Sequence, residues 1–343
     1  MRIKFAILML LAWLCGVVHA EIQMLNIYTW AGYMPDTVIR QFEQETGITV
    51  NVSTYVNNEV LYAKLKANPD SSYDIIVPST YMVERMAKNG LLQKIDKTKL
   101  TNLSNIDPIF LQQQYDRDND HSVPYLWNAT GIVVNRKYHP DLKIEHWKEL
   151  WQPQYANKLL VLDDAREIFS MALLVLGDST NSTDPEQIKR AFAQLNALMP
   201  NIKLFNTEAP RSIYIDEDIT IGMSLNGDAY LAQKENANLE FFYPKEGFIV
   251  SLDSLAIAAG AKNLANAHKF INFVLRADIA KDITLQSGFP TTNLAAKTLL
   301  PDHIRLNSIV YPNAKTMQRA HFQTDVGAAT AIYEKYFELL KLK

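Results

Sequence analysis

Short β-branched segments alternate with helical segments from residue 24 onward, and this order is the strongest constraint on the fold. The first segments read MLNIYTW, PDTVIRQFEQETG, ITVNVSTY, NNEVLYAKLKAN, YDIIVPS and TYMVERMAKNG. Their apolar spacing predicts βαβαβ order and therefore an α/β fold. We expect Val38, Ile39 and Phe42 to face inward from the first helix, which Gly47 ends with a left-handed cap.

A second alternating set follows and predicts a second lobe. It contains a strand over 159–162, helices over 165–177 and 184–199, and strands near 202–206, 219–225, 239–243 and 248–259. The extended segment 122–136 and the strand near 248–259 are long enough to cross between the lobes, and a further helix is predicted over 264–286. We therefore expect one lobe to comprise 21–128 plus 253–300 and the other 129–252 plus 301–343, with hinge motion about a cleft.

The composition fits two globular domains. The chain has 343 residues, of which 48% are hydrophobic and 21% are charged. At roughly 100 to 200 residues per domain, this length predicts about two domains. The formal net charge of -3 and the even spread of charged residues leave no basic stripe for a phosphate backbone. We therefore expect no nucleic-acid partner.

The first 20 residues have the pattern of a signal peptide. Arg2 and Lys4 precede an apolar run over 5–18, and small residues precede the expected cleavage site after Ala20. The run has about 14 residues, whereas a spanning helix needs roughly 20, so a retained membrane anchor is the weaker alternative. We expect export and no stable membrane insertion after cleavage. The single cysteine, Cys15, is lost with the peptide, which leaves neither a disulfide nor a thiol nucleophile.

No sequence motif indicates nucleotide binding or nucleophilic catalysis. The sequence has no GxGxxG, Walker A, GxSxG or SxxK pattern. The histidines beyond residue 20 never stand three or four residues apart, which disfavours a metal site on one helix. We therefore predict no metal, no cofactor and no enzymatic activity.

Several acidic residues occupy positions that suit either ligand binding or a structural role. Asp164 and Glu167 are three residues apart at a helix start, so both carboxylates can point the same way. Helix capping is the alternative role for such residues. Asp253 lies in an apolar run, where a carboxylate is costly to bury, and we expect it to need a cationic partner from the protein or a ligand.

Aromatic and hydroxyl residues occur in the loops that lead from strands into helices. Trp30, Tyr33, Ser79 and Tyr81 occupy such loops, although core packing is the alternative role for the aromatic ones. Ligands of open α/β sheets bind outside the carboxyl ends of the strands. Aromatic faces attract cations and can flank an aliphatic chain. Together with the carboxylates, these residues predict a cleft for an elongated amine.

At these residues the sequence resembles the periplasmic polyamine-binding proteins of ATP-binding-cassette (ABC) importers. The similarity is most specific in YTWAGYMP, VPSTYMVERM, LQKIDKTKLTN, DDAREIF, PKEG, DSLAI, PTTNLAAK and QTDVGAA. The resemblance implies a type II periplasmic binding protein fold, with two α/β lobes joined by crossing hinge segments that close on spermidine or putrescine. It also implies a periplasmic receptor that needs no cofactor and delivers its ligand to an inner-membrane permease.

The resemblance implies a set of ligand-binding residues. The aromatic and hydroxyl contacts of the family match Trp30, Tyr33, Ser79, Tyr81, Thr207 and Phe289, and its polar anchors match Asp164, Glu167, Asp253 and Gln323.

The chain also departs from the family pattern. Leu225 and Ser251 stand where the spermidine/putrescine binders have tryptophans, and Ala31-Gly32 stands where they have Thr-Glu. Asp228 follows the turn glycine, as in putrescine-preferring relatives. The preferred ligand length is therefore open, and Asp228 either anchors an amino group or caps the helix that begins there.

Other functions share part of this pattern. A receptor for another cationic small molecule and a sensor that signals polyamine occupancy to a partner protein both fit the pocket chemistry. An amino-acid receptor would need an arginine for the ligand carboxylate, for which Arg166 and Arg211 are available, and a ferric-ion receptor would need paired tyrosines. An enzyme on this scaffold is disfavoured by the missing nucleophile and metal patterns.

Overall fold

The strands of the described chain form one continuous sheet in the computed structural model, which describes residues 23–342. They are β1 Met24–Trp30, β2 Thr49–Tyr55, β3 Ile75–Ile76, β4 Ser122–Asn135, β5 Leu159–Val161, β6 Ile202–Phe205, β7 Ile221–Leu225, β8 Leu239–Phe242, β9 Phe248–Ile257 and β10 Ala320–Phe322. The sheet order is β2-β1-β3-β9-β4-β7-β5-β6, with β10 added to β9 and β8 added to β4. The predicted signal peptide, residues 1–20, lies outside the described residues.

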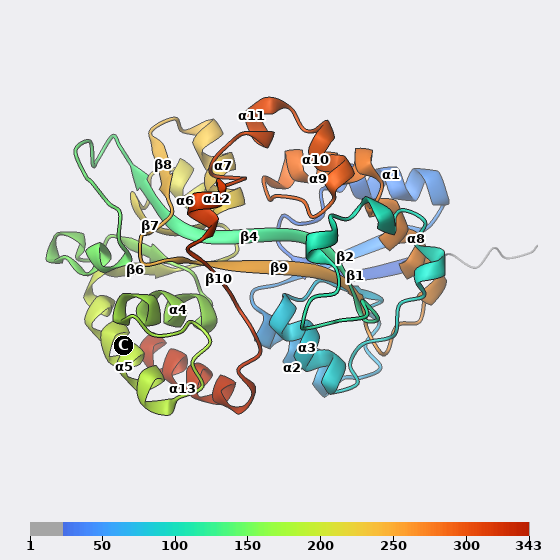
Figure 1. The fold of residues 1–343 in the computed structure, drawn as a ribbon, viewed down its shortest axis with the longest axis horizontal. Coiled ribbons are helices and arrows are strands. Elements are labelled where there is room, and N and C mark those ends of the chain that lie inside the picture. Colours follow the sequence, from blue (N-terminus) through green and yellow to red (C-terminus); the bar gives the residue numbers. More distant parts are fainter. Residues whose placement is uncertain (1–22, 343) are drawn as a thin grey trace, which may run out of the picture.

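Helices cover both faces of the sheet (Figure 1). They are α1 Asp36–Thr46, α2 Asn58–Ala67, α3 Thr80–Lys88, α4 Ala165–Leu176, α5 Pro185–Leu198, α6 Pro210–Ile215, α7 Asn226–Glu235, α8 Leu264–Val274, α9 Ala277–Ser287, α10 Leu294–Leu299, α11 Asp302–Arg305, α12 Ala314–Met317 and α13 Thr330–Lys341. Short 3-10 turns occur at Lys97–Lys99, Leu103–Asn105, Pro108–Phe110, Trp147–Trp151, Pro153–Tyr155, Met199–Asn201 and Gly327–Ala329.

Two long antiparallel strands, β4 and β9, run through both halves of the molecule. β4 pairs with β9 from Ser122 to Ala129 and then with β7 from Thr130 to Val134. In Figure 1 they connect a group of elements around β1, β2 and β3 with a second group around β5, β6 and β7. We call these groups the first lobe and the second lobe. Both segments that were predicted to cross between lobes are present as strands.

Strand residues are buried on both faces, since each lobe has helices on both sides of the sheet. In the first lobe, Ile27 and Ile75 pack with residues of α1, α8 and α9, whereas Tyr28 and Ile76 pack with residues of α2 and α3 on the other side. In the second lobe, Leu160 packs with residues of α6 and α7, while its neighbours face α4, α5 and α13. Successive side chains of a strand point to opposite faces, which explains why these strands are apolar throughout.

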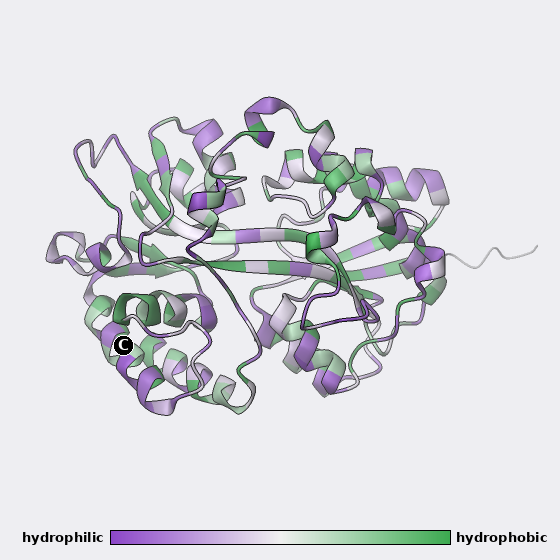
Figure 2. Cartoon of the chain, in the orientation of Figure 1, coloured by the Kyte–Doolittle hydropathy of each residue, from purple (hydrophilic) through white to green (hydrophobic). Residues whose placement is uncertain are grey.

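Helix α4 is hydrophobic around most of its circumference (Figure 2). Residues 165–174 are all buried, since α4 lies against α5, α13 and β9. A helix surrounded by protein needs no polar face. Its length is that of an ordinary core helix, and among the described residues no helix combines the length and the apolar character needed to cross a membrane.

The first helix follows its prediction. Val38, Ile39 and Phe42 of α1 are buried, and Gly47 ends the helix with a φ of 70°. The amide of Gly47 donates to the Glu43 carbonyl at 2.8 Å, as expected of a left-handed cap.

The single helix predicted over 264–286 is wrong, because the chain forms two helices, α8 and α9. The break lies at Leu275 and Arg276. Side-chain amides of Asn105 and Asn293 donate to the Leu275 carbonyl at 3.0 and 2.8 Å and satisfy it where the helix stops. The apolar residues keep their spacing through the break, so periodicity alone could not reveal it.

Candidate functional site

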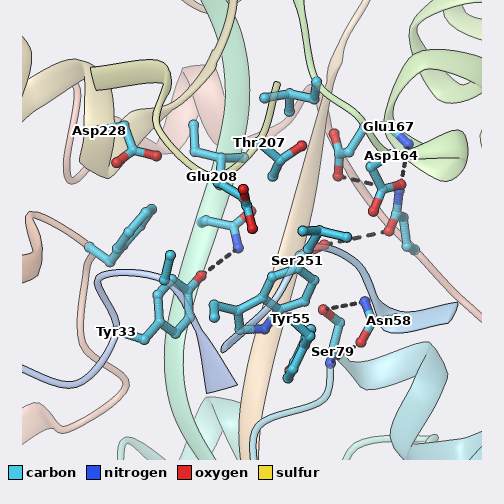
Figure 3. Close-up of a pocket in the computed structure, with 18 residues that line it drawn as sticks. Tyr33, Tyr55, Asn58, Ser79, Asp164, Glu167, Thr207, Glu208, Asp228 and Ser251 are labelled. Atoms are coloured by element: carbon cyan, nitrogen blue, oxygen red, sulfur yellow. Dashed lines mark hydrogen bonds between the residues drawn. The ribbon is translucent and has the colours of Figure 1, made fainter. Parts of the chain in front are cut away.

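Loops at the ends of strands from both lobes meet at one pocket (Figure 3). Trp30 is the last residue of β1, and Ser79 is the N-cap of α3. From the second lobe, Asp164 is the N-cap of α4, and Thr207 follows β6. The pocket is lined by Trp30, Ala31, Tyr33, Tyr55, Val56, Asn58, Ser79, Asn128, Leu162, Asp164, Glu167, Thr207, Glu208, Leu225, Asp228, Ser251, Phe289 and Gln323.

The charged side chains that line the pocket are all acidic. Asp164, Glu167, Glu208 and Asp228 contribute four carboxylates, and the described lining contains no lysine, arginine or histidine. Carboxylates that lack protein cations attract positively charged ligands. The pocket is therefore suited to a ligand with more than one positive charge.

Asp164 and Glu167 lie together at the start of α4. The Oδ1 atom of Asp164 accepts hydrogen bonds from the backbone N–H groups of Arg166 at 2.8 Å and Glu167 at 3.1 Å. The Thr130 hydroxyl donates to Oε2 of Glu167 at 2.7 Å. Burial raises the pKa of Glu167 to about 8, and the negative charge of Asp164 adds to the rise. Asp164 therefore combines the capping role with a place in the pocket lining.

Asp228 lies in the first turn of α7 and its carboxylate has no hydrogen-bond partner among the described residues. Burial raises the pKa of Asp228 to about 7, while the positive charge of Arg211 acts to lower it. No side-chain hydrogen bond caps the described start of α7. The geometry thus lacks the contact that the capping role requires and leaves this carboxylate facing the pocket.

Asp253 lies just beneath the lining, where it is 1% exposed. Its carboxylate accepts hydrogen bonds from the Ser79 hydroxyl at 2.5 Å, the Tyr33 hydroxyl at 2.7 Å and the Asn128 amide at 3.0 Å. Burial raises the pKa of Asp253 to about 6, while these three donors lower it. The protein supplies three neutral donors to this carboxylate and no cation, so a cationic partner from a ligand stays a prediction. All three donor residues line the pocket.

Aromatic rings form the walls of the pocket. The ring centroids of Trp30 and Tyr55 are 4.6 Å apart, and those of Tyr33 and Phe289 are 4.9 Å apart. A Cβ atom at Gly227 would lie 2.4 Å from the Phe289 ring, so glycine is required for α7 of the second lobe to approach this wall. These faces leave space between them for a ligand with a hydrocarbon chain.

Nine of the eleven predicted ligand-binding residues line the pocket, namely Trp30, Tyr33, Ser79, Asp164, Glu167, Thr207, Asp228, Phe289 and Gln323. Asp253 contacts the lining from below, and Tyr81 lies outside it. Tyr55, Asn58, Asn128 and Glu208 also line the pocket and were not predicted from the sequence. Glu208 and Asn58 follow strand ends, which is a signal that could have found them, whereas Asn128 lies inside a long apolar strand and gives no such signal.

Tyr81 contacts an arginine of the other lobe instead of the pocket. Its hydroxyl donates to Glu59 at 3.3 Å, and the Arg166 guanidinium lies 5.2 Å from its ring centroid. Arg166 is 2% exposed and also lies 5.4 Å from the ring of Tyr333. Tyr81 and Arg166 therefore form an interlobe packing contact.

Neither arginine considered for an amino-acid receptor lines the pocket. Arg166 is enclosed as described above, and Arg211 pairs with Glu235. The described residues also contain no group of three or more histidine, cysteine, aspartate or glutamate side chains arranged to hold a metal ion.

The fold and the pocket define a two-lobed solute-binding protein. The family model of the bacterial extracellular solute-binding proteins matches residues 37–305. The spermidine/putrescine-binding periplasmic protein of Salmonella typhimurium is 48% identical over 317 residues, which cover 92% of this chain and 91% of that protein. The chain belongs to the bacterial extracellular solute-binding proteins and, within them, to the family of periplasmic spermidine/putrescine-binding proteins.

Solved structures agree with this assignment. A spermidine/putrescine ABC transporter structure from Listeria monocytogenes is 32% identical, covers 93% of this chain and 99% of its own, and has a TM-score of 0.90. The substrate-binding protein of the spermidine/putrescine ABC transporter from Streptococcus pneumoniae is 35% identical with the same coverage and a TM-score of 0.76. The predicted family and the predicted type II periplasmic binding protein fold are both confirmed.

Proposed function

We propose that the protein is the periplasmic substrate-binding component of a polyamine ABC importer. It captures a polyamine such as spermidine or putrescine between its lobes and delivers it to an inner-membrane permease. The observation that carries this proposal is the pocket lining, in which four carboxylates and four aromatic rings occur without a single basic side chain. The names of the relatives in Salmonella typhimurium and Escherichia coli support it.

Polyamines match this lining in charge and in shape. Each protonated amino group requires an acceptor, since removing an ammonium from water is costly unless it is paired and hydrogen-bonded. Asp228 at one side of the pocket and the pair Asp164 and Glu167 at the other supply such acceptors. The methylene chain lies between the faces of Tyr33, Tyr55, Trp30 and Phe289, and Gln323, Ser79 and Thr207 add polar contacts. Asp253 acts through Tyr33, Ser79 and Asn128.

The mature receptor operates by lobe closure and requires no cofactor. Its lobes comprise 21–128 plus 253–300 and 129–252 plus 301–343, and β4 and β9 form the hinge. A signal peptide over residues 1–20 takes the protein to the periplasm and is removed there. Binding is not accompanied by chemical conversion of the ligand.

Calorimetry on the exported protein tests the ligand class. We expect binding of putrescine, cadaverine, spermidine, spermine or agmatine, with no heat from glutamate or other acidic amino acids at the same concentrations. Binding of an amino acid in the absence of polyamine binding would overturn the proposal. Mass spectrometry of the recovered polyamine should show an unchanged molecule, whereas a product would indicate an enzyme.

Uptake of labelled polyamine by cells separates a transport receptor from a sensor. Deleting the gene should abolish the high-affinity part of the uptake. A protein that binds polyamine in solution and yet has no effect on uptake would fit the sensor alternative.

A further inference from the structure

The hydrogen bonds around the buried Asp253 carboxylate have defined directions. The Ser79 hydroxyl donates to one carboxylate oxygen, and the Tyr33 hydroxyl donates to the other. Because a hydroxyl group has a single proton, each of these two side chains directs its only donor at Asp253. The side-chain amides of Asn58 and Asn128 contact the same two hydroxyl oxygens from behind.

Asn58 can only donate to the Ser79 hydroxyl. Its Oδ1 atom accepts the backbone N–H of Ser79 at 3.1 Å, and its Nδ2 atom donates to the Ser79 hydroxyl oxygen at 3.1 Å (Figure 3). Since a backbone N–H cannot accept a hydrogen bond, this contact fixes which end of the amide faces the hydroxyl. The Ser79 proton is thereby kept on the side of Asp253.

Asn128 has the same effect on Tyr33. Its Nδ2 atom donates to the Asp253 carboxylate at 3.0 Å and to the Tyr33 hydroxyl oxygen at 3.1 Å. Both side chains are buried, and Asn128 belongs to the central strand β4. This amide adds a third donor to the carboxylate and keeps the Tyr33 proton directed at it.

Such an arrangement suits an ionised carboxylate and not a protonated one. One oxygen of Asp253 faces the donor of Ser79, and the other faces the donors of Tyr33 and Asn128. A carboxylate only accepts hydrogen bonds, whereas a carboxylic acid must direct its proton at an acceptor. A proton added to either oxygen would therefore point at another donor unless the network rearranged. These donors oppose the effect of burial, which favours the neutral acid.

Charges of the protein do not replace these donors. The groups that lower the pKa of Asp253 are the neutral side chains of Ser79, Tyr33 and Asn128, and the described pocket lining contains no basic residue. The other titratable groups close to Asp253 are Tyr33, Tyr55 and Glu167. Burial raises the pKa of both tyrosines well above the usual value, so they stay neutral, and Glu167 contributes charge of the same sign as Asp253.

We propose that Asn58 and Asn128 are positioning residues that keep the Asp253 carboxylate ionised in the unliganded protein. They do so by holding the hydroxyl protons of Ser79 and Tyr33 on its two oxygens. The inference deepens the proposed polyamine function and depends on it for the effect on binding. A carboxylate that is already ionised attracts a cation without first releasing a proton, so polyamine affinity extends to lower pH than it would in a pocket without these amides.

Two substitutions release the hydroxyl protons, and the affinity for putrescine is then compared at pH 8 and pH 6. Asn128→Leu keeps the approximate shape of the side chain and removes its donor, and Asn58→Ser replaces the amide by a hydroxyl that can also accept. The control is Asn135→Leu, because Asn135 is a buried asparagine at the end of the same strand β4 and lies outside the pocket lining. The ratio of the two affinities cancels any contribution that does not depend on pH.

In both pocket variants, the ratio of affinity at pH 8 to affinity at pH 6 should be about fivefold larger than in the parent protein, as expected if the Asp253 titration moves up by about one pH unit. In Asn135→Leu the ratio should stay within about twofold of the parent. A ratio that is the same in all four proteins, or an affinity that falls equally at both pH values, would overturn the role of the asparagines.

A measurement without ligand tests the same inference independently. The side-chain carboxyl signal of Asp253 can be followed by carbon NMR and assigned by its loss in Asp253→Asn. Its titration midpoint should move up by about one pH unit in Asn128→Leu and Asn58→Ser and stay in place in Asn135→Leu. An unchanged midpoint in both pocket variants overturns the inference. A parent protein that binds no polyamine overturns the proposed function, whereas the NMR midpoints still decide what the two asparagines do.

Discussion

The Asp228 carboxylate is shielded from water and accepts no hydrogen bond from the described residues. It therefore lowers the stability of the unliganded protein, whereas it strengthens the binding of a cationic ligand. Asp184 is the matched contrast, because its side chain accepts a hydrogen bond from the Glu186 N–H at 2.9 Å and caps α5. Both residues belong to the first turn or cap of a helix. They differ because the Asp228 carboxylate faces the pocket, whereas the Asp184 carboxylate accepts a hydrogen bond from its own helix.

We predict that Asp228→Ser weakens polyamine binding by about 1.5 to 3 kcal/mol without lowering the free energy of unfolding. Serine can cap a helix but cannot neutralise an ammonium. In the control Asp184→Ala, the free energy of unfolding should fall by about 1 kcal/mol, with unchanged affinity. Calorimetry and thermal denaturation give the two quantities. Full affinity in Asp228→Ser would show that Asp228 does not anchor the ligand.

We predict that Asp253→Asn weakens polyamine binding by about 1.5 to 3 kcal/mol, the range typical of a hydrogen bond to a charged group, because the buried carboxylate holds the Tyr33, Ser79 and Asn128 side chains in place. The substitution removes the negative charge beneath the pocket and places an amide where Tyr33 and Ser79 donate. Asp116→Asn is the control, because Asp116 is also buried and accepts three hydrogen bonds, yet lies outside the pocket lining. Equal polyamine affinity in Asp253→Asn and Asp116→Asn would show that Asp253 does not contribute to binding.

Polyamine affinity should increase with pH between about 5.5 and 8. The pKa values of Asp253, Asp228 and Glu167 are raised to about 6, 7 and 8, so each loses its negative charge within this range as the pH falls. Alkyl ammonium groups resemble lysine, with a pKa of about 10.4, and stay charged. We expect an affinity about tenfold or more lower at pH 5.5 than at pH 8 by calorimetry. A flat profile would contradict the anchoring role of these carboxylates.

The same titrations act on the unliganded protein with the opposite sign. A carboxyl group whose pKa is raised by folding stabilises the fold below its unfolded pKa of about 4, and this contribution is lost as the pH rises through its folded pKa. Asp253, Asp228 and Glu167 should therefore lower the stability of the free protein between about pH 4 and pH 8. The increase in melting temperature caused by ligand should consequently be larger at pH 8 than at pH 5.5.

At the scale of elements, the pocket residues in strand-to-helix loops could be predicted from the sequence, whereas the pocket residues within strands could not. Trp30, Ser79 and Asp164 could be assigned because each lies where a short apolar segment ends and a helix begins. Asn128 lies in the middle of β4, and its role depends on Asp253 of the neighbouring strand, 125 positions away in the chain. A partner so distant in sequence leaves no local pattern.

Helix α3 provides a prediction about Tyr81, which packs against Arg166 across the lobes. Tyr81→Phe keeps the ring and removes only the hydroxyl, so polyamine affinity should stay within about twofold of the parent. Tyr81→Ala removes a side chain that is 3% exposed and should lower the free energy of unfolding by about 3 kcal/mol or more. Tyr33→Phe is the matched comparison, because Tyr33 lines the pocket and its hydroxyl contacts Asp253. If Tyr81→Phe lost as much affinity as Tyr33→Phe, Tyr81 would have to be a ligand-binding residue.

At the scale of the whole molecule, a ligand that contacts both lobes should hold them together. We predict that saturating spermidine reduces the radius of gyration measured by small-angle X-ray scattering and raises the melting temperature by mass action, with about 2.7 kcal/mol gained at one hundred times the dissociation constant. Sodium chloride at matched ionic strength is the control for charge screening. Identical scattering profiles with and without ligand would contradict hinge closure.

The two-lobed architecture was predictable because alternating strands and helices resume after a long extended segment. The continuity of the sheet was not, because it depends on β4 pairing with β9 and β7 in succession. The break between α8 and α9 was missed for a related reason, since amides from Asn105 and Asn293 approach it from other parts of the chain.

The route of the chain through the sheet also limits the order in which the molecule can be assembled during synthesis. The core on one side of the first lobe joins residues near the start, such as Leu25, with Leu255, Phe270 and Phe289. Neither this core nor β9 can be completed until most of the polypeptide has left the ribosome. Contacts of such long sequence separation form slowly. A nascent chain that ends before Leu255 therefore lacks part of the core of the first lobe, so this lobe stays incomplete for longer than a domain built from one continuous segment.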